Sequence, residues 1–293
     1  MSLRHFVDNR PALYGILGHP LSHTLSPPMQ QAAFDAARRS ARYVPFDVPP
    51  AQLARAIRLL RCIGAAGFNV TVPHKERVLR YLDRVDRTAR AIGAVNTVVR
   101  RGTQLVGYNT DVAGLLDAWR EMPRLRVRGA TAFLLGAGGA ARAVLWALRH
   151  ARAARVVLTN RTPRRASSLQ RWARRALPQL PITVAPWRQR ACELARQHPA
   201  LIVNATSLGL HAGDSMPVAL AAVPRACAVY DLAYRRPTTA FIVAARRRGL
   251  LASDGRSMLL YQGARAFTLW TGQSAPLPMM RRALYGAHAS KSA

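Results

Sequence analysis

Residues 133–141 read Phe133-Leu134-Leu135-Gly136-Ala137-Gly138-Gly139-Ala140-Ala141, which places the pattern G-x-G-x-x-A between an apolar strand and a helix. Gly136 permits a tight turn, Gly138 lets the backbone approach a pyrophosphate, and Ala141 is small enough for the helix to pack on the strand. The phosphates would lie over the N–H groups at the start of the helix. A Gly-Ala-Gly-Gly run can also be a simple tight turn, but its two flanks favour a dinucleotide-binding loop.

The strand after this loop indicates which dinucleotide binds. An NAD site usually carries Asp or Glu at the end of this strand, where the carboxylate binds the ribose 2′-hydroxyl. Here the strand at 155–159 is followed by Asn160-Arg161-Thr162-Pro163-Arg164-Arg165, which contains no carboxylate. Arg161 and Arg165 would form charge-assisted, forked hydrogen bonds with a 2′-phosphate. In so arginine-rich a chain their presence could be incidental, so the missing acid is the stronger reason to predict NADP.

Alternating strands and helices extend from this loop in both directions. Toward the N-terminus we expect strands at 12–18, 44–48 and 67–72, a hairpin at 97–106, a helix capped by Ser26, and helices at 52–61, 75–82 and 111–122. Toward the C-terminus we expect strands at 131–135, 155–159, 182–184, 201–204 and 228–232, and helices at 140–150, 163–176, 257–271 and 278–285. This alternation predicts an α/β fold with mostly parallel sheets, and 293 residues favour two domains.

The net charge of +31 would by itself suggest a nucleic-acid-binding protein. Lys75 and Lys291 are the only lysines; the other basic residues are arginines spread over every segment. No nucleic-acid-binding motif accompanies them, so a coding bias toward arginine explains the charge better. We expect weak, salt-dependent attraction to polyanions without sequence preference.

Three features bear on where the protein functions. No run of 18 or more apolar residues is present, and the start from Met1 to Arg10 lacks the apolar core of a secretion signal. The cysteines, Cys62, Cys192 and Cys227, are scattered and form no C-x-x-C pair. We therefore expect a cytoplasmic protein without a disulfide framework, a membrane span or a metal site.

Lys75 is the most informative basic residue. It stands in Asn69-Val70-Thr71-Val72-Pro73-His74-Lys75-Glu76, in a chain that uses arginine almost everywhere else. Arginine cannot lose its proton in a protein, whereas lysine can. The reduction of a ketone by hydride transfer requires a proton donor at the carbonyl oxygen, and an amine near a cleft suits that role. The alternative is an ordinary lysine at a helix start.

Polar residues at the ends of other elements are further candidates. Asp111, one of 13 acids, is expected at a helix start, where it could also be a simple cap. Asn96 follows Gly93-Ala94-Val95 and could be a turn residue. His74 adjoins Lys75, but adjacent residues point in different directions, so we assign it no role.

With these segments in order, the chain resembles the shikimate dehydrogenase family over nearly its whole length. The matching segments are His23 to Pro27, Asn69 to Glu76, Gly93 to Thr97, Asn109 to Asp111, Gly136 to Ala141, Asn160 to Thr162, Asn204 to Ser207, Asp231 to Tyr234 and Met258 to Gln262. The Asn-Val-Thr-Val-Pro-x-Lys-Glu run is very specific, whereas the glycine loop alone is not.

The resemblance implies an N-terminal α/β substrate domain at 1–111, a Rossmann NADP-binding domain at 112–256, and C-terminal helices at 257–293 that return to the first domain. It implies reversible, NADP-dependent reduction of 3-dehydroshikimate to shikimate, within chorismate and aromatic amino acid biosynthesis. The implied partners are small molecules, without a specific nucleic acid or a membrane, and the implied assembly is a monomer or homodimer.

Site residues follow from the same resemblance. The implied substrate pocket comprises Thr24, Ser26, Thr71, Lys75, Asn96, Asp111, Tyr234 and Gln262. Lys75 and Asp111 would be the catalytic acid–base pair, with Asp111 orienting the amine. The implied cofactor site comprises Gly136, Ala137, Gly138, Gly139, Ala140, Asn160, Arg161, Thr162 and Arg165, with Leu232 and Gly255 beside the nicotinamide.

Three departures from the family pattern stand out. Thr24 occupies a position where serine is common, which leaves the preference for shikimate over quinate open. Ser257 replaces a usual glycine, and His74 replaces a common apolar aromatic residue.

Three rival interpretations remain. An NAD-dependent quinate/shikimate dehydrogenase conflicts with the absence of an acid after Thr159. A non-catalytic ligand sensor on the same fold would be expected to lack Lys75 or Asp111. A nucleic-acid-binding protein is supported by net charge alone.

Overall fold

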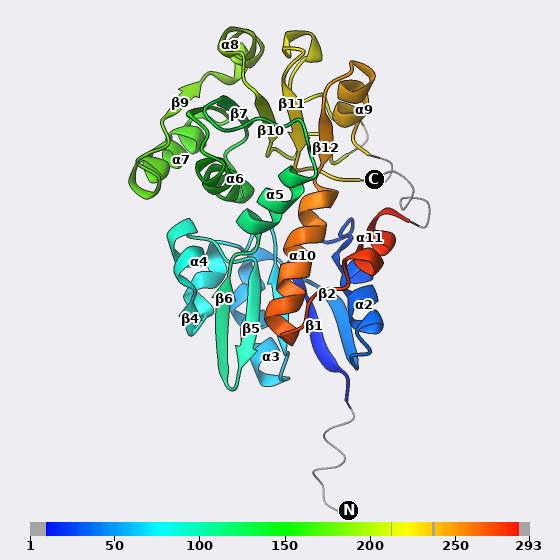
Figure 1. The fold of residues 1–293 in the computed structure, drawn as a ribbon. Coiled ribbons are helices and arrows are strands. Elements are labelled where there is room, and N and C mark those ends of the chain that lie inside the picture. Colours follow the sequence, from blue (N-terminus) through cyan, green and yellow to red (C-terminus); the bar gives the residue numbers. More distant parts are fainter. Residues whose placement is uncertain (1–9, 212, 236–237, 287–293) are drawn as a thin grey trace, which may run out of the picture. The chain divides into compact units, whose positions relative to one another are not determined.

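The computed structural model describes residues 10–211, 213–235 and 238–286, and Figure 1 shows their fold. The predicted absence of a secretion signal concerns residues that lie mostly outside these ranges. The chain divides into two compact units, one formed by Met1–Thr110 with Gln262–Ala293 and one by Asp111–Tyr261. The unit boundaries thus lie at 110/111 and 261/262, where the sequence places them at 111/112 and 256/257.

The first unit contains a mixed six-stranded sheet in the order β2-β1-β3-β5-β6-β4. Strands β2, β1 and β3 run parallel, β5 is antiparallel to β3 and β6, and β4 pairs parallel with β6. Their bounds are β1 Ala12–Gly18, β2 Ala41–Asp47, β3 Gly67–Val70, β4 Arg84–Val85, β5 Thr97–Arg101 and β6 Gln104–Tyr108. The helical segments are α2 Ser26–Ala36, η1 Pro50–Gln52, α3 Leu53–Cys62, η2 Arg77–Tyr81 and α4 Arg87–Ile92.

Two local expectations for this unit are wrong. Ser26 is the first residue of α2 rather than its cap, and its N–H donates to Thr24 Oγ1 at 3.3 Å. The helix expected at 75–82 is only the short 3₁₀ turn η2, because its flanks are held by other elements. The Lys75 carbonyl accepts from Val95 N at 2.8 Å, and Asp83 N donates to the Leu105 carbonyl at 3.0 Å.

Helix α4 was not predicted, although its signals are local. The Asp86 side chain accepts from Thr88 N, and Gly93 closes the helix at a φ of 70°. An Asp cap and a left-handed glycine are ordinary helix boundaries. A helix of six residues is too short to show a clear apolar periodicity, so the sequence pattern did not predict α4.

The C-terminal helices return to the first unit, as the family resemblance predicts. Helix α10, Arg256–Thr271, crosses the boundary between the units, and α11, Leu277–Tyr285, lies beside α2. Trp270 donates from Nε1 to the Val98 carbonyl at 2.9 Å, and its ring lies 5.2 Å from that of Tyr14. Gln30 donates from Nε2 to the Gly263 carbonyl at 2.9 Å, so buried contacts fix α10 on the first sheet.

The second unit contains an all-parallel sheet in the order β12-β11-β10-β7-β8-β9. Its strands are β7 Thr131–Leu135, β8 Arg155–Thr159, β9 Ile182–Ala185, β10 Leu201–Asn204, β11 Ala228–Asp231 and β12 Ala252–Asp254. The remaining elements are α5 Asp111–Arg120, α6 Gly139–His150, α7 Pro163–Ala176, η3 Trp187–Gln189, α8 Arg190–Gln197, η4 Leu220–Ala222 and α9 Ala240–Arg247. This is the Rossmann strand order, and it confirms the predicted fold class. Helices α8 and α9 and strand β12 were not predicted.

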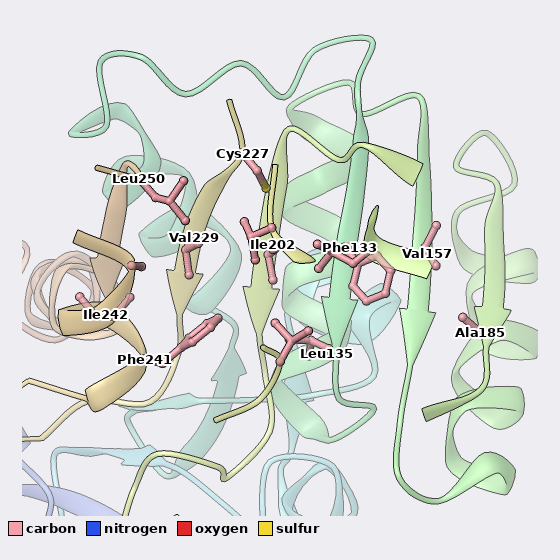
Figure 2. Packing of buried hydrophobic residues seen from close by; sticks show 14 residues of the cluster. Phe133, Leu135, Val157, Ala185, Ile202, Cys227, Val229, Phe241, Ile242 and Leu250 are labelled. Atoms are coloured by element: carbon pink, nitrogen blue, oxygen red, sulfur yellow. The ribbon is translucent and has the colours of Figure 1, made fainter. Parts of the chain in front are cut away.

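A buried apolar cluster, shown in Figure 2, covers one face of this sheet. Phe133 and Leu135 of β7, Ile202 of β10 and Val229 of β11 contribute to it, and Phe241 of α9 packs against them. The parallel register aligns Leu135 with Asn204 and Asn204 with Asp231. The carboxyl ends of β7, β10 and β11 therefore meet at one edge, and the strand order reverses between β7 and β10. Ligands of such folds bind at this reversal point.

Candidate functional site

The glycine loop begins at the carboxyl end of β7. Gly136 has a φ of 108°, and a Cβ there would lie 2.7 Å from the Ala205 carbonyl carbon and oxygen. Its N–H donates to the Thr159 carbonyl at 2.8 Å. Both the left-handed backbone and the close approach of Ala205 therefore require glycine at this position.

Gly138 and Gly139 differ from Gly136, because the protein itself does not require glycine there. A Cβ at either position would meet no atom within 4 Å. Gly138 caps α6, and Gly139 is its first residue, so the loop exposes N–H groups at a helix N-terminus. A side chain would fill this space, so these glycines fit the close approach of a pyrophosphate.

Asn160 connects the glycine loop to the segment after β8. Its Oδ1 accepts from Ala137 N at 3.0 Å, and its Nδ2 donates to the Thr162 carbonyl at 2.9 Å. Arg161 and Arg165 follow and are exposed. Across residues 10–211, 213–235 and 238–286, neither arginine side chain has a hydrogen bond or ion pair, so both guanidinium groups can receive an anion.

Leu232 and Gly255 meet at the ends of β11 and β12. A Cβ on Gly255 would lie 2.2 Å from the Leu232 carbonyl oxygen. Tyr234 follows two residues after Leu232 and is half-buried. The sheet register thus brings together the two residues that the family resemblance places at the nicotinamide.

Asn96 is the centre of a buried polar cluster in the first unit. Its Nδ2 donates to Thr110 Oγ1 at 2.9 Å and to Gln262 Oε1 at 3.2 Å, and its Oδ1 accepts from Thr110 N at 2.8 Å. Asn96 is 2% exposed and Gln262 8% exposed. We call Asn96, Thr97, Thr110 and Gln262 the Asn96 cluster. The structure therefore joins two predicted substrate ligands, Asn96 and Gln262, through a direct hydrogen bond.

The other predicted substrate ligands of the first unit lie on separate segments. Thr24 is half-buried and Ser26 is buried at the start of α2. Thr71 follows β3, and its N–H donates to the Leu17 carbonyl at 2.8 Å. A Cβ at Gly18 would lie 2.3 Å from Thr71 Cγ2, so the ends of β1 and β3 hold Thr71 closely.

Lys75 and Asp111 belong to different segments of the chain. Lys75 is half-buried before η2, and its carbonyl is fixed by Val95. Asp111 is 3% exposed and is the first residue of α5. His74 is fully buried, and its Nε2 lies 2.6 Å from the Val48 carbonyl; because that carbonyl can only accept, Nε2 carries the proton. His74 thus connects the Lys75 segment to the residues after β2.

The second unit contains a second buried polar cluster, whose residues lie in two of the matching segments but were given no role from the sequence. Asp231 and Asn204 are both fully buried at the ends of β11 and β10, and Asn204 Nδ2 donates to Asp231 Oδ1 at 2.8 Å. Burial raises the pKa of Asp231 to about 6, although hydrogen bonds from Thr239 and Asn204 lower it. An aspartate directly after the apolar residues 228–230 was the available signal.

Neither a candidate metal site nor a membrane-spanning helix is found in the part of the chain that the structure describes. No group of three or more His, Cys, Asp or Glu side chains there could hold a metal ion. No helix among the described residues has the length and apolar character to cross a membrane.

Comparisons with known proteins agree on one family. Residues 16–98 match the family model of the shikimate dehydrogenase substrate binding domain, and residues 255–285 match that of the shikimate 5'-dehydrogenase C-terminal domain. A shikimate dehydrogenase (NADP(+)) of Symbiobacterium thermophilum is 44% identical over 98% of this chain and 98% of the relative.

Two solved structures illustrate the range of ligands in similar proteins. Shikimate 5-dehydrogenase of Thermus thermophilus, in complex with NADP(H) and shikimate, is 37% identical with a TM-score of 0.81, covering 93% of this chain and 98% of that chain. Quinate dehydrogenase of Corynebacterium glutamicum, in complex with NAD, is 29% identical with a TM-score of 0.85, covering 94% of this chain and 99% of that chain.

Proposed function

Because this chain belongs to the shikimate dehydrogenase family, we propose that it catalyses the reversible, NADP-dependent reduction of 3-dehydroshikimate to shikimate. The observation that carries the proposal is 44% identity to a shikimate dehydrogenase (NADP(+)) over nearly the full length of both chains. The reaction belongs to the shikimate pathway, which leads to chorismate and the aromatic amino acids.

The cofactor assignment rests on the residues of the second unit. The open space at Gly138 and Gly139 suits a pyrophosphate, and the segment after β8 offers arginines but no carboxylate. Arg161 and Arg165 would bind the 2′-phosphate through charge-assisted hydrogen bonds. Asn160 and Thr162 would hold that segment at the glycine loop, since Asn160 already bonds Ala137 N and the Thr162 carbonyl. Leu232 and Gly255 would border the nicotinamide.

The substrate assignment rests on polar groups that can match a carboxylate and ring hydroxyls. Ser26, Tyr234 and Thr24 carry hydroxyl groups that can donate to the substrate carboxylate. Asn96, Gln262, Thr71 and Asp111 offer amide, hydroxyl and carboxylate groups for the ring hydroxyls. The buried bonds of Asn96 would orient its amide before the substrate arrives, so little conformational entropy would be lost on binding.

Lys75 is proposed to move the proton. The chemistry that bound NADPH supplies is a hydride for the carbonyl carbon. Lys75 donates a proton from Nζ to the carbonyl oxygen, which becomes the hydroxyl of shikimate, and accepts it again in the reverse direction. Asp111 would orient the amine. This pairing rests on the family resemblance.

Initial rates with shikimate and quinate, each with NADP and NAD, test this proposal against its nearest rival. We expect the shikimate and NADP combination to give the highest kcat/KM. A preference for quinate and NAD would instead support the rival enzyme, whose structural relative binds NAD. A protein that binds shikimate without turnover would support the ligand-sensor interpretation.

The proposal extends to location and assembly. A cytoplasmic protein fits the three cysteines, which are all free among the described residues, with Cys62 and Cys192 exposed. Monomer and homodimer both fit the proposal, and light scattering coupled to size-exclusion chromatography distinguishes them. We propose no specific nucleic-acid partner, because scattered arginines neutralise phosphates without reading bases.

A further inference from the structure

The ends of β10 and β11 carry a pair of buried polar side chains that the proposed chemistry does not use. Asn204 and Asp231 are adjacent in the parallel register and fully buried. Asn204 Nδ2 donates to Asp231 Oδ1 at 2.8 Å. Neither side chain is accessible to a ligand, so any influence on catalysis must pass through the residues that they hold.

Asn204 holds the loop that follows β10. Its Oδ1 accepts from Thr206 Oγ1 at 2.7 Å and from Thr206 N at 3.1 Å, and its Nδ2 also donates to the Leu208 carbonyl at 3.1 Å. Leu208 N in turn donates to Thr206 Oγ1 at 3.1 Å. One side chain therefore sets the backbone path of residues 205–208.

This loop is in direct contact with the glycine loop. A Cβ at Gly136 would lie 2.7 Å from the Ala205 carbonyl carbon and 2.9 Å from Thr206 N. Ala205 N donates to the Leu135 carbonyl at 2.7 Å, one residue before Gly136. A shift of residues 205 and 206 must therefore displace Gly136.

Asp231 holds the segment that follows β11. Its Oδ1 also accepts from Ala233 N at 3.0 Å, its Oδ2 accepts from Thr239 Oγ1 at 2.7 Å, and Leu232 N donates to the Asn204 carbonyl at 2.8 Å. Gly255 packs directly against the Leu232 carbonyl. Asp231 therefore fixes the backbone of Leu232 and Ala233.

We propose that Asn204 and Asp231 are positioning residues, which set the spacing between the glycine loop and the Leu232–Ala233 segment and thereby align the two ends of the cofactor. The proposal rests on the proposed function, because that function places the pyrophosphate at the glycine loop and the nicotinamide at the Leu232–Ala233 segment.

Burial raises the pKa of Asp231 to about 6, so the carboxylate is ionised at neutral pH. The nearby Asp254 contributes to this rise and is itself paired with Arg256 at 2.7 Å. An ionised acceptor strengthens the three hydrogen bonds that it receives.

Three variants test whether the hydrogen bonds of Asn204 and Asp231 position the two cofactor-binding segments. Asp231→Ala removes the acceptor and should lower kcat/KM for NADP by about 10- to 100-fold, the usual effect of a small displacement of reacting groups. Asp231→Asn keeps an oxygen for Asn204 and Ala233 and offers an amide to Thr239 Oγ1, so kcat/KM should stay within about threefold of the parent. Asn204→Asp places two carboxylates in contact, so its loss relative to the parent should be larger at pH 8 than at pH 6, where the pair shares a proton.

Amide hydrogen exchange without cofactor tests the coupling directly. Release of Asn204 in Asp231→Ala should speed exchange at Thr206 N, which belongs to the other loop. The NADP dissociation constant, measured by calorimetry, should rise with it. Tyr230→Phe is the matched control, because it removes a buried bond to Ser257 Oγ from the preceding residue of the same strand. The control should lower the melting temperature and leave exchange at Thr206 and the dissociation constant unchanged.

The outcomes separate this proposal from the proposed function. If Asp231→Ala shows unchanged exchange at Thr206 and unchanged NADP affinity, the positioning role is overturned. The proposed function still stands in that case, provided that the parent protein is active. If Asp231→Ala fails to fold, Asn204→Asp supplies the same test, and a loss of kcat/KM that is equal at pH 6 and pH 8 would overturn the proposal. A parent protein that neither binds NADP nor oxidises shikimate would instead overturn the proposed function.

Discussion

The Asn96 cluster and the segment Asn160–Arg165 are the two regions that we propose recognise substrate and cofactor, and they are built differently. Asn96 is buried, and hydrogen bonds with Thr110 and Gln262 hold its amide in place. Arg161 and Arg165 are exposed, and their side chains have no partner among the described residues. One region is ordered by the protein, and the other is left to be ordered by its ligand.

This difference separates two kinds of effect. Removing a buried hydrogen-bonding group leaves its partners unsatisfied, which costs about 1–3 kcal/mol of stability. Replacing an exposed arginine changes stability by no more than about 0.5 kcal/mol. Changes at the first region should therefore affect folding and catalysis together, whereas changes at the second should affect affinity alone.

The largest expected effect tests the substrate side. Lys75→Arg keeps the positive charge and most hydrogen-bonding capacity, so the fold and substrate binding should survive. It removes the amine that is proposed to donate the proton, so kcat should fall by about 10²- to 10⁴-fold with a smaller change in KM. Steady-state kinetics with shikimate and NADP measure both constants.

The double variant sharpens this test. Asp111→Asn should compound with Lys75→Arg less than additively, because groups that act as one unit cannot be lost twice. A Lys75→Arg enzyme that turns over at nearly the parental rate would show that the proton comes from another donor, such as Tyr234 or water.

The second effect is a pH dependence of the stability, which is expected from the cluster around Asp231, because Asp231 can ionise. Burial raises the pKa of Asp231 from 3.8 to about 6, so the folded state binds this proton more tightly than the unfolded state. The resulting stabilisation is fully present below pH 3.8 and is lost as the pH rises through 6. A pKa difference of this size between the folded and unfolded states corresponds to about 3 kcal/mol.

Urea unfolding of the parent and of Asp231→Asn over this pH range measures the effect, since other titrating groups are common to both proteins. The parent should lose stability relative to the variant as the pH rises. A stability difference that does not change with pH would show that Asp231 keeps an ordinary pKa.

The third effect concerns the Asn96 cluster itself. Asn96→Ala should lower the free energy of unfolding by about 2 kcal/mol, because Thr110 N and Gln262 lose a buried partner. It should also raise KM for shikimate. Trp270→Phe is the control, since it removes a buried bond of 2.9 Å to the Val98 carbonyl in the same sheet. The control should lose stability without a change in KM; an equal rise of KM in both variants would remove the specific role of Asn96.

A smaller effect is expected at the exposed arginines. Arg161→Asp should lower the preference for NADP over NAD by about tenfold, because the carboxylate repels a 2′-phosphate and accepts from a 2′-hydroxyl. The melting temperature should stay unchanged. Arg171→Asp makes the same charge change at an exposed position on α7 and should leave the preference intact. If Arg161→Asp keeps the parental preference, the 2′-phosphate is bound elsewhere.

The smallest effect is expected at Thr24, a proposed substrate ligand. Thr24→Ser removes one methyl group, worth about 1 kcal/mol in a tight pocket, and should change the ratio of kcat/KM for shikimate and quinate. The hydroxyl remains and can still accept from Ser26 N, so NADP affinity should not change. Thr24→Val, which lacks that acceptor, should lower stability as well. A shift of cofactor affinity at a constant substrate ratio would show that Thr24 is misplaced.

The sequence by itself determined the features that depend on local patterns. The glycine loop, the hairpin of β5 and β6, the strands flanking Gly136 and most helices follow from apolar periodicity and turn residues, which act over a few positions. The absence of an acid after Thr159 is equally local, so the choice of NADP follows from the order of residues in one short segment. The single internal lysine was conspicuous for the same reason.

Tertiary structure alone decided which distant residues share a hydrogen bond. Asn96 and Gln262 are 166 residues apart, and Asn204 and Asp231 are 27 apart. No local pattern encodes these pairs, because they arise from the return of α10 to the first sheet and from the parallel register of β10 and β11. The short turn η2 in place of a helix has the same origin, since Val95 and Leu105 hold its flanks. Burial and strand register, which depend on the whole chain, overrode local helix propensity there.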